Sequence, residues 1–149
     1  MRYFLDTEYN GIGGALLSLA LVPEHGEELY LTLDWDGHLE EWVERNVAPY
    51  LDTVPDGLVS PRMSRADAAR TIAHYLAGDA GPLIVADWPE DIAQFNALLV
   101  TGPGIMAEVP GLTFQFVPLS GFSTAANSKV PHNALHDARA LRDHILGLE

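Results

Sequence analysis

The sequence predicts an α/β fold in which a mixed five-stranded sheet, three antiparallel strands followed by two parallel ones, is flanked by helices. Two observations predict it. Up to Leu33 the apolar residues form runs or alternate as in strands, and after Asp34 their period lengthens to about 3.6 residues, with short apolar runs between helical stretches. The chain of 149 residues is also long enough for one hydrophobic core and short for two. We therefore expect a single domain over residues 1–149.

Three strands are predicted at the start of the chain. The first runs from Tyr3 to Glu8, the second from Ala15 to Val22 and the third from Leu29 to Leu33. The second is nearly continuous in apolar residues, as in a strand buried on both faces, whereas the third alternates as in a half-buried strand. The turn between the first two is rich in glycine, over residues 10–14. Short connections of this kind favour an antiparallel meander.

Two helices follow the meander. The first ends before Pro49, because the residue preceding a proline disfavours helical geometry. The second begins at Ser64, with Asp67 three residues later as an approximate capping box, and ends before Gly78. Their apolar stripes are Leu39, Trp42, Val43 and Val47 in the first, and Ala69, Ile72, Ala73 and Leu76 in the second.

The second half of the chain alternates between strand and helix patterns, with strands over 82–86 and 112–116. The helix between them has Pro89 in its first turn, and Asp87 with Glu90 is predicted to cap it. A loop over 102–104 ends it, and a polar loop over 118–131 precedes the last helix. The predicted apolar stripes are Ile92, Phe95, Asn96 and Leu99 in the first of these helices, and Leu135, Ala138, Leu141, Ile145 and Leu148 in the last.

Composition narrows the class of function. The chain contains no cysteine, which excludes disulfide scaffolds, thiolate metal sites and cysteine nucleophiles. Its formal charge of −13 argues against gripping long nucleic acid through counterion release. No signal peptide, transit segment or membrane-spanning run is recognisable, so we expect a cytoplasmic protein without a membrane partner.

Three groups of acids stand where strands end or helices begin. Asp6 and Glu8 are two residues apart in the first strand, so both point to the same face; either they are solvated, or a cation lies between them. Asp91 follows the predicted cap in the third helix, and a lone acid there is ordinarily a surface residue. Asp137 lies between apolar positions of the last helix, where a carboxylate needs a partner.

Histidines accompany the third group. His132 and His136 are four residues apart, which on a helix would put two imidazoles on one face as a zinc pair. The metalloprotease version of that motif needs Glu after the first histidine, and Asn133 stands there instead. Open α/β sheets place ligands beyond the carboxyl ends of their strands, where all three acid groups are predicted to lie.

These residues together resemble the DEDDh class of 3′-to-5′ exonucleases, which have the ribonuclease H-like fold. The motifs are Phe4-Leu5-Asp6-Thr7-Glu8, the D-x-x-x-F from Asp91 to Phe95 and the H-x-x-x-x-D from His132 to Asp137. Small size and the opening residues look most like compact bacterial exoribonucleases related to ribonuclease T and oligoribonuclease. The second motif departs from the pattern, because Asp87 stands where the family often has Asn. Asp91 is our choice for the second-motif carboxylate, with Asp87 as the alternative.

The resemblance implies a two-metal site. Asp6, Glu8, Asp91 and Asp137 would bind two Mg²⁺ or Mn²⁺ ions, roughly 3.5 to 4 Å apart. His132 would act as the general base, because its ordinary pKa of about 6.5 is close to working pH. The expected reaction is the release of nucleoside monophosphates from the 3′ ends of single-stranded RNA or short oligonucleotides.

Further predictions concern the residues that contact substrate, the oligomeric state and the competing functions. Tyr9, Trp88 and Phe122 are candidates for stacking on bases, and Lys129, with Arg62 and Arg139, for meeting phosphates. Backbone amides between Glu8 and Gly14 are candidates for contacting a terminal nucleotide. The region of Trp35, Trp42 and Pro49 could cover a second copy in a homodimer. The competing hypotheses are an exonuclease acting on DNA, an endonuclease of the same fold and a non-catalytic nucleic-acid-binding module.

Overall fold

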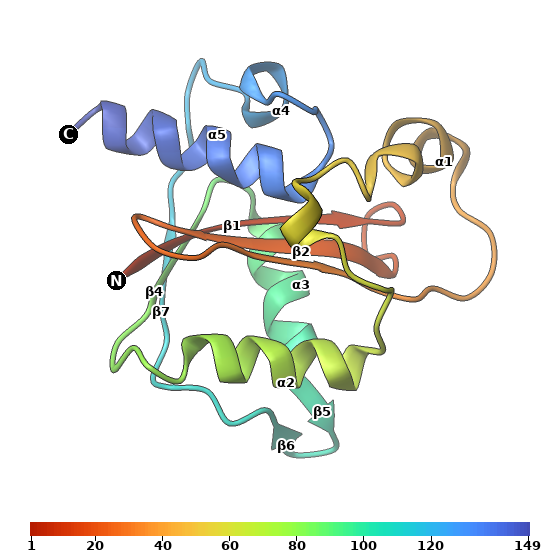
Figure 1. The fold of residues 1–149 in the computed structure, drawn as a ribbon, viewed down its shortest axis with the longest axis horizontal. Coiled ribbons are helices and arrows are strands. Elements are labelled where there is room, and N and C mark those ends of the chain that lie inside the picture. The colour runs from red at the N-terminus through yellow and green to blue at the C-terminus, as the bar shows by residue number, and fades with distance from the viewer.

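A computed structural model describes all residues from 1 to 149 and has a five-stranded mixed sheet at its centre (Figure 1). The strands lie in the order β3-β2-β1-β4-β7, and a separate two-stranded sheet pairs β5 with β6. The strands are β1 Arg2–Tyr9, β2 Leu16–Pro23, β3 Leu29–Thr32, β4 Leu83–Ala86, β5 Val100–Gly102, β6 Ile105–Met106 and β7 Thr113–Phe116. The α-helices are α1 Glu41–Asn46, α2 Arg65–Leu76, α3 Pro89–Leu99, α4 Thr124–Asn127 and α5 Ala134–Gly147.

The strand directions confirm the predicted mixed sheet. β1 pairs antiparallel with β2, and β2 pairs antiparallel with β3. On its other side β1 pairs parallel with β4, which in turn pairs parallel with β7. β1 is therefore the strand at which the meander meets the parallel half of the sheet. Its carboxyl end lies beside that of β4, as expected for a ligand crevice in an open α/β sheet.

Helices cover both faces of the sheet. In Figure 1, α2 and α3 lie on one side, and α5 lies on the other together with α1 and α4. Side chains of β1 alternate between these layers: Tyr3 and Leu5 belong to the main apolar cluster with α2 and α3, whereas Phe4 packs against Leu141 of α5. By the same alternation Asp6 and Glu8 point toward the α5 layer.

Capping residues set the ends of the two longest helices. Ser64 accepts a hydrogen bond from the backbone N–H of Asp67 (3.1 Å), so the predicted start of α2 is confirmed. At α5 the side chain of Asn133 accepts from the N–H groups of Leu135 (3.2 Å) and His136 (3.4 Å). The α5 helix therefore begins after His132, which lies in the preceding turn.

The start of α3 differs from the prediction. Trp88, not Asp87, is the N-cap residue, and no side chain caps the helix. The predicted stripe is also out of phase: Asn96 is exposed, whereas Asp91, Gln94, Phe95, Leu98 and Leu99 are buried. The spacing of these buried positions by three and four residues places Asp91 on the covered face of α3. Asp91, at a position where a lone acid is ordinarily a surface residue, is therefore directed inward.

Smaller differences concern the connections. The predicted loop around Gly102 is a hairpin, β5–β6, whose turn uses Gly104 with a positive φ of 67°. The polar loop over 118–131 contains the short helix α4, which Ser123 caps. α1 is shorter than its predicted stripe and continues into a 3-10 turn over Ala48–Tyr50, beyond Pro49. None of the helices combines the length and apolar character needed to cross a membrane.

Candidate functional site

The carboxyl half of β1 carries two buried acids. Asp6 is 8% exposed and Glu8 is 9% exposed, although each lies on a strand that is otherwise filled with core residues. Their neighbours across the antiparallel pair, Ala20 and Ser18, offer them no positive charge. The expectation that both acids share a face is confirmed, and the reading in which they are solvated is wrong.

Asp91 reaches the same place from α3. One of its carboxylate oxygens, Oδ1, accepts hydrogen bonds from the backbone N–H (3.1 Å) and the hydroxyl (2.6 Å) of Thr7, the residue between the two acids of β1. Asp91 is 3% exposed. Its second oxygen accepts no hydrogen bond from the protein and remains available to a ligand. Thr7 therefore fixes the carboxylate of Asp91 beside Asp6 and Glu8.

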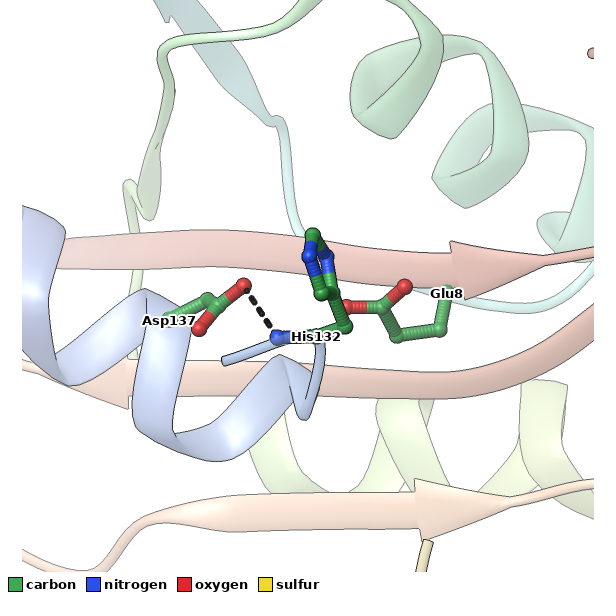
Figure 2. Close-up of side chains that lie close together, drawn as sticks. All are labelled: Glu8, His132 and Asp137. Carbon is green, nitrogen blue, oxygen red and sulfur yellow. Dashed lines mark hydrogen bonds between the residues drawn. The ribbon is translucent and has the colours of Figure 1, made fainter. Parts of the chain in front are cut away.

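Asp137 and His132 come from the start of α5 (Figure 2). Asp137 is 4% exposed, and its Oδ2 accepts a hydrogen bond from the backbone N–H of His132 at 3.2 Å. His132 is the one non-glycine residue with a positive φ, 62°, because the chain turns sharply there before entering the helix. This turn directs the imidazole toward Glu8, whose carboxylate lies on the far side of the ring from Asp137 in Figure 2.

The two histidines do not form a zinc pair. His132 lies outside the helix, so the four-residue spacing does not bring its ring beside that of His136 on a helical face. The Nε2 atom of His136 is hydrogen-bonded to the carbonyl oxygen of Thr53 at 2.9 Å. His136 is thus a structural contact between α5 and the segment after α1.

Burial and mutual repulsion perturb all four carboxylates. Desolvation, followed by the charge of Asp91 and of the other acids, raises the pKa of Asp6 well above its usual range. Desolvation, followed by the charge of Asp137, raises the pKa of Glu8 to about 8. Desolvation also raises the pKa of Asp91 to about 7, against the hydrogen bonds from Thr7, and raises that of Asp137. Four acids that disfavour their charged forms are stable together only when they bind protons or a compensating cation.

The donor set fits divalent cations. One oxygen of Asp6 (Oδ2) and one of Asp137 (Oδ1) are buried without any hydrogen-bond partner, which is costly for a carboxylate unless an ion or a proton satisfies it. Carboxylate oxygens are the ligands that Mg²⁺ and Mn²⁺ prefer. No lysine or arginine lines the surrounding cleft. A cation from solution is therefore the partner that these acids lack.

The acids open into a cleft of about 380 Å³. Residues of three further segments line it beside β1: Asp87 and Trp88 before α3, residues 122–125 around the start of α4, and His132. Of the predicted stacking residues, Tyr9, Trp88 and Phe122 all line the cleft. Trp88 is 57% exposed and free to meet a ligand, whereas Phe122 already stacks on His144, with ring centroids 3.8 Å apart.

The predicted phosphate contacts lie elsewhere. Lys129 does not line the cleft and instead lines a neighbouring groove with Arg139 and Arg142. Arg139 is paired with Glu28, and Arg62 with Asp52. The glycine-rich turn is also committed internally, because the N–H groups of residues 10, 11 and 14 bind backbone carbonyls and that of residue 13 binds Glu90. A larger cavity, of about 760 Å³, lies between α2 and residues 101–110, away from the acids.

Sequence reasoning missed two residues of this site. Thr7 was noted only as part of a motif, yet it holds Asp91. Trp42, expected in the core or on a partner surface, is 53% exposed and meets His132 edge to face, with ring centroids 4.8 Å apart. Asn10 ties α1 to the end of β1, accepting from the N–H of Glu40 at 2.7 Å. Only the tertiary fold brings the α1 helix beside His132, so local sequence patterns contain no signal for this contact.

Comparison with models of known protein families finds no match to this chain, and comparison with curated proteins finds none either. The function therefore has to be argued from the chemistry of the cleft itself.

Proposed function

We propose that this protein is a metal-dependent 3′-to-5′ exoribonuclease of the DEDDh class, with a ribonuclease H-like fold, that releases nucleoside monophosphates from single-stranded RNA ends or short oligonucleotides. One observation carries the proposal: four buried carboxylates, two of them with unpartnered oxygens, share an open cleft that a histidine lines but no lysine or arginine does. A merely structural cluster would have been neutralised from within the chain. Acids left in this state indicate a site built to bind cations.

Asp6, Glu8, Asp91 and Asp137 would hold two divalent ions, Mg²⁺ or Mn²⁺. When bound, such ions offset the charge that develops on a phosphodiester during hydrolysis. The protein's own contribution is to hold four carboxylates in a fixed arrangement: β1 provides two of them, Thr7 fixes the third, and the capped start of α5 fixes the fourth. Because the strand and both helices are rigid, binding does not require the acids to be gathered first.

His132 is proposed as the general base that takes a proton from the attacking water. Its ring lines the cleft beside Glu8 and Asp137. A base must lie within hydrogen-bond reach of the proton that it removes, and a position between two cation-binding carboxylates meets that condition. The backbone N–H of His132 is anchored to Asp137, so the ring can rotate without the turn shifting.

We propose that the cleft contacts only a few nucleotides of the substrate. Tyr9, Trp88 and Phe122 line the cleft, and stacking on an aromatic ring contributes roughly 1–3 kcal/mol per base. The formal charge of −13 and the absence of lysine or arginine from the cleft leave little to grip a long phosphate backbone. We therefore expect weak affinity for long substrates and a modest dependence on salt.

The proposal is tested with single-stranded RNA and DNA of the same sequence, each labelled at the 5′ end, with Mg²⁺, Mn²⁺ or EDTA. A ladder that shortens from the 3′ end of RNA with either metal, and stops with EDTA, supports it. Faster degradation of DNA would change the substrate to DNA, and internal cuts would indicate an endonuclease. RNA binding without any product, at every metal concentration, would replace the enzyme with a binding module.

Asp6→Asn is the decisive variant, because the charges of the other three carboxylates all raise the pKa of Asp6. We expect a loss of activity of roughly 10³-fold, or about 4 kcal/mol of transition-state stabilisation. Asp36→Asn, at an exposed loop position, is the matched control and should leave the rate unchanged. Full metal-dependent activity in Asp6→Asn would refute the site assignment.

Two further expectations belong to the same proposal. An enzyme that degrades RNA ends would meet its substrate in the cytoplasm. A homodimer through the region of Trp35, Trp42 and Pro49, in which Trp42 is exposed, is the proposed assembly, and light scattering would decide it.

A further inference from the structure

Three side chains in the cleft form a tighter group than the four acids as a whole. One ligand atom each from Glu8, His132 and Asp137, two carboxylate oxygens and one imidazole nitrogen, lie within 4.8 Å of one another (Figure 2). Glu8 lies at the end of β1, Asp137 in the first turn of α5, and His132 in the turn that precedes α5. The group therefore offers a metal ion one imidazole nitrogen in addition to carboxylate oxygens.

Separations of this size are close to those of a metal site. Zn²⁺ binds histidine nitrogen and carboxylate oxygen at about 2.1 Å in tetrahedral geometry, so two of its ligand atoms lie about 3.4 Å apart. The ligand atoms of this group lie within 4.8 Å of one another, so an adjustment of at most about 1.4 Å brings them to that separation. Rotation of the long Glu8 side chain covers such a difference. Three protein ligands with one open position is also the usual arrangement of an open Zn²⁺ site.

The Oδ1 atom of Asp137 gives an independent indication of a ligand. It is buried without a hydrogen-bond partner on a residue that is 4% exposed, while the other oxygen is engaged by the N–H of His132. A buried carboxylate oxygen in this state is satisfied by a cation or by a proton. Of the side chains within reach of the cleft, none is a lysine or arginine.

Donor chemistry separates the cations that this group would accept. Mg²⁺ favours carboxylate, carbonyl and water oxygens and gains little from imidazole, whereas Zn²⁺ and Co²⁺ bind imidazole well. At an N/O site the affinity rises along the series from Mn²⁺ to Cu²⁺ and remains high for Zn²⁺. A mixed nitrogen and oxygen group therefore discriminates between hard ions and imidazole-binding ions.

We propose that Glu8, His132 and Asp137 form a binding site for one imidazole-binding transition-metal ion, such as Zn²⁺, which occupies the nitrogen of His132 and excludes it from acting as a base. The inhibitory part rests on the proposed function, because it concerns the same cleft; the binding part does not. His132 then has two incompatible states: its imidazole is free in the presence of Mg²⁺ and is a metal ligand in the presence of Zn²⁺. The nuclease would be inhibited by Zn²⁺ even when Mg²⁺ is abundant.

Binding is measured first, without substrate, by titrating the full-length protein with ZnCl₂ and MgCl₂ in a calorimeter. The visible absorption of Co²⁺ gives a second readout, because its intensity rises when protein ligands replace its octahedral hydration shell. The test variant is His132→Asn, since Asn tolerates a positive φ better than most residues and preserves the turn. His25→Asn, at an exposed position between β2 and β3, is the matched control.

We expect one Zn²⁺ per chain, an affinity for Zn²⁺ that falls about tenfold or more in His132→Asn, and a Mg²⁺ affinity that changes less than about twofold. The Co²⁺ band should weaken in the same variant and persist in His25→Asn. Unchanged Zn²⁺ affinity in His132→Asn would overturn the proposal, because the carboxylates alone would then hold the ion.

The activity measurement follows separately. If Mg²⁺-dependent cleavage is present and micromolar Zn²⁺ leaves it intact despite His132-dependent binding, the inhibitory part is wrong. If the protein cleaves no nucleic acid but binds Zn²⁺ through His132, the metal site stands and the proposed nuclease function fails. The two failures are thus distinguishable.

Discussion

Two clusters of partly or fully buried charge lie against α5, and they are built in opposite ways. In the first, Glu28 accepts hydrogen bonds from the guanidinium group of Arg139 at 2.9 and 3.1 Å, and Arg142 adds a contact at 3.4 Å. Asp143 completes that cluster with a bond to Arg142, so two acids meet two bases. In the second, Asp6, Glu8, Asp91 and Asp137 meet no basic side chain except the imidazole of His132.

The difference shows that the chain can neutralise an acid that packs against α5 when the fold requires it. Only eight lysine and arginine residues are available against 21 acids, yet two of them are committed to Glu28. None is assigned to the four acids that are most deeply buried. The missing charge in the second cluster is therefore a property of the site, and not a shortage of arginine near α5.

The largest expected effect comes from removing the charge of Asp91, which is the member of the unpaired cluster that lies on α3. Asp91→Asn should lower metal-dependent activity by roughly 10³-fold, because it removes a proposed cation ligand; the Asn oxygen can still accept from Thr7 and keep the local fold. Asp87→Asn should cost less than about tenfold. Initial rates on labelled RNA check both variants. The opposite ranking would make Asp87 the second-motif carboxylate.

Glu8→Gln should stabilise the metal-free protein, although it should lower activity because it removes a proposed cation ligand. The pKa of Glu8 is raised from an ordinary 4.5 to about 8, first by desolvation and then by the charge of Asp137. Between these values the unfolded chain releases the proton while the folded chain retains it, so the unfolded state binds fewer protons. The free energy of unfolding therefore falls as pH rises through this window, by roughly 1 kcal/mol for each pH unit.

The measurement is urea unfolding in EDTA at several pH values from 4.5 to 8. Wild type should lose stability across the window, and Glu8→Gln should lose less and exceed wild type by about 2 kcal/mol at pH 7. Glu108→Gln, at an exposed position, should follow wild type. Adding Mn²⁺ should stabilise wild type more than Glu8→Gln. If the free energy of unfolding changed with pH in the same way in wild type and in Glu8→Gln, burial would not raise the pKa of Glu8.

A smaller effect is expected from Trp42, which belongs to neither cluster but touches His132. An edge-to-face aromatic contact contributes about 1 kcal/mol, so Trp42→Ala should lower kcat about fivefold with little change in KM. Trp42→Phe should restore most of the rate, because it retains a ring against the imidazole. Trp88→Ala, at the exposed stacking position, should raise KM instead. Equal effects on KM in both variants would assign Trp42 to substrate binding rather than to positioning His132.

Much of this arrangement was accessible from sequence, and the exceptions have physical causes. The strand pattern of β1 was enough to place Asp6 and Glu8 on one face, because alternation is fixed by the backbone. The phase of α3 was misjudged, since Ile92 is more apolar than Asp91 and pulled the predicted stripe by one position. Burial of Asp91 depends on Thr7, which lies 84 residues away in sequence.

The turn at His132 shows the same limit. The sequence placed this residue just before the last helix, but its positive φ and the contact with Trp42 depend on how α1 packs. The zinc pair with His136 that the spacing would allow does not form, because the helix begins two residues after His132. Capping by Asn133 decides that boundary, whereas in the sequence Asn133 stands out only as a departure from a protease motif.

The smallest expected effect is also the one that tests the paired cluster. Arg139→Ala should lower the free energy of unfolding by about 1 kcal/mol or less, because the pair is partly exposed and Arg142 remains beside Glu28. Arg45→Ala, which breaks the fully exposed pair with Glu41, is the control and should cost less. Chemical unfolding at low and high salt measures both. The sign of the change in the free energy of unfolding matters more than its size. Removing a charge should destabilise the protein at the Glu28 cluster, which the chain has neutralised. Removing a charge should stabilise the protein at the cleft acids, which are left for a cation. A gain in stability in Arg139→Ala would erase that contrast, and with it the inference that the cleft acids are unpaired because they bind metal.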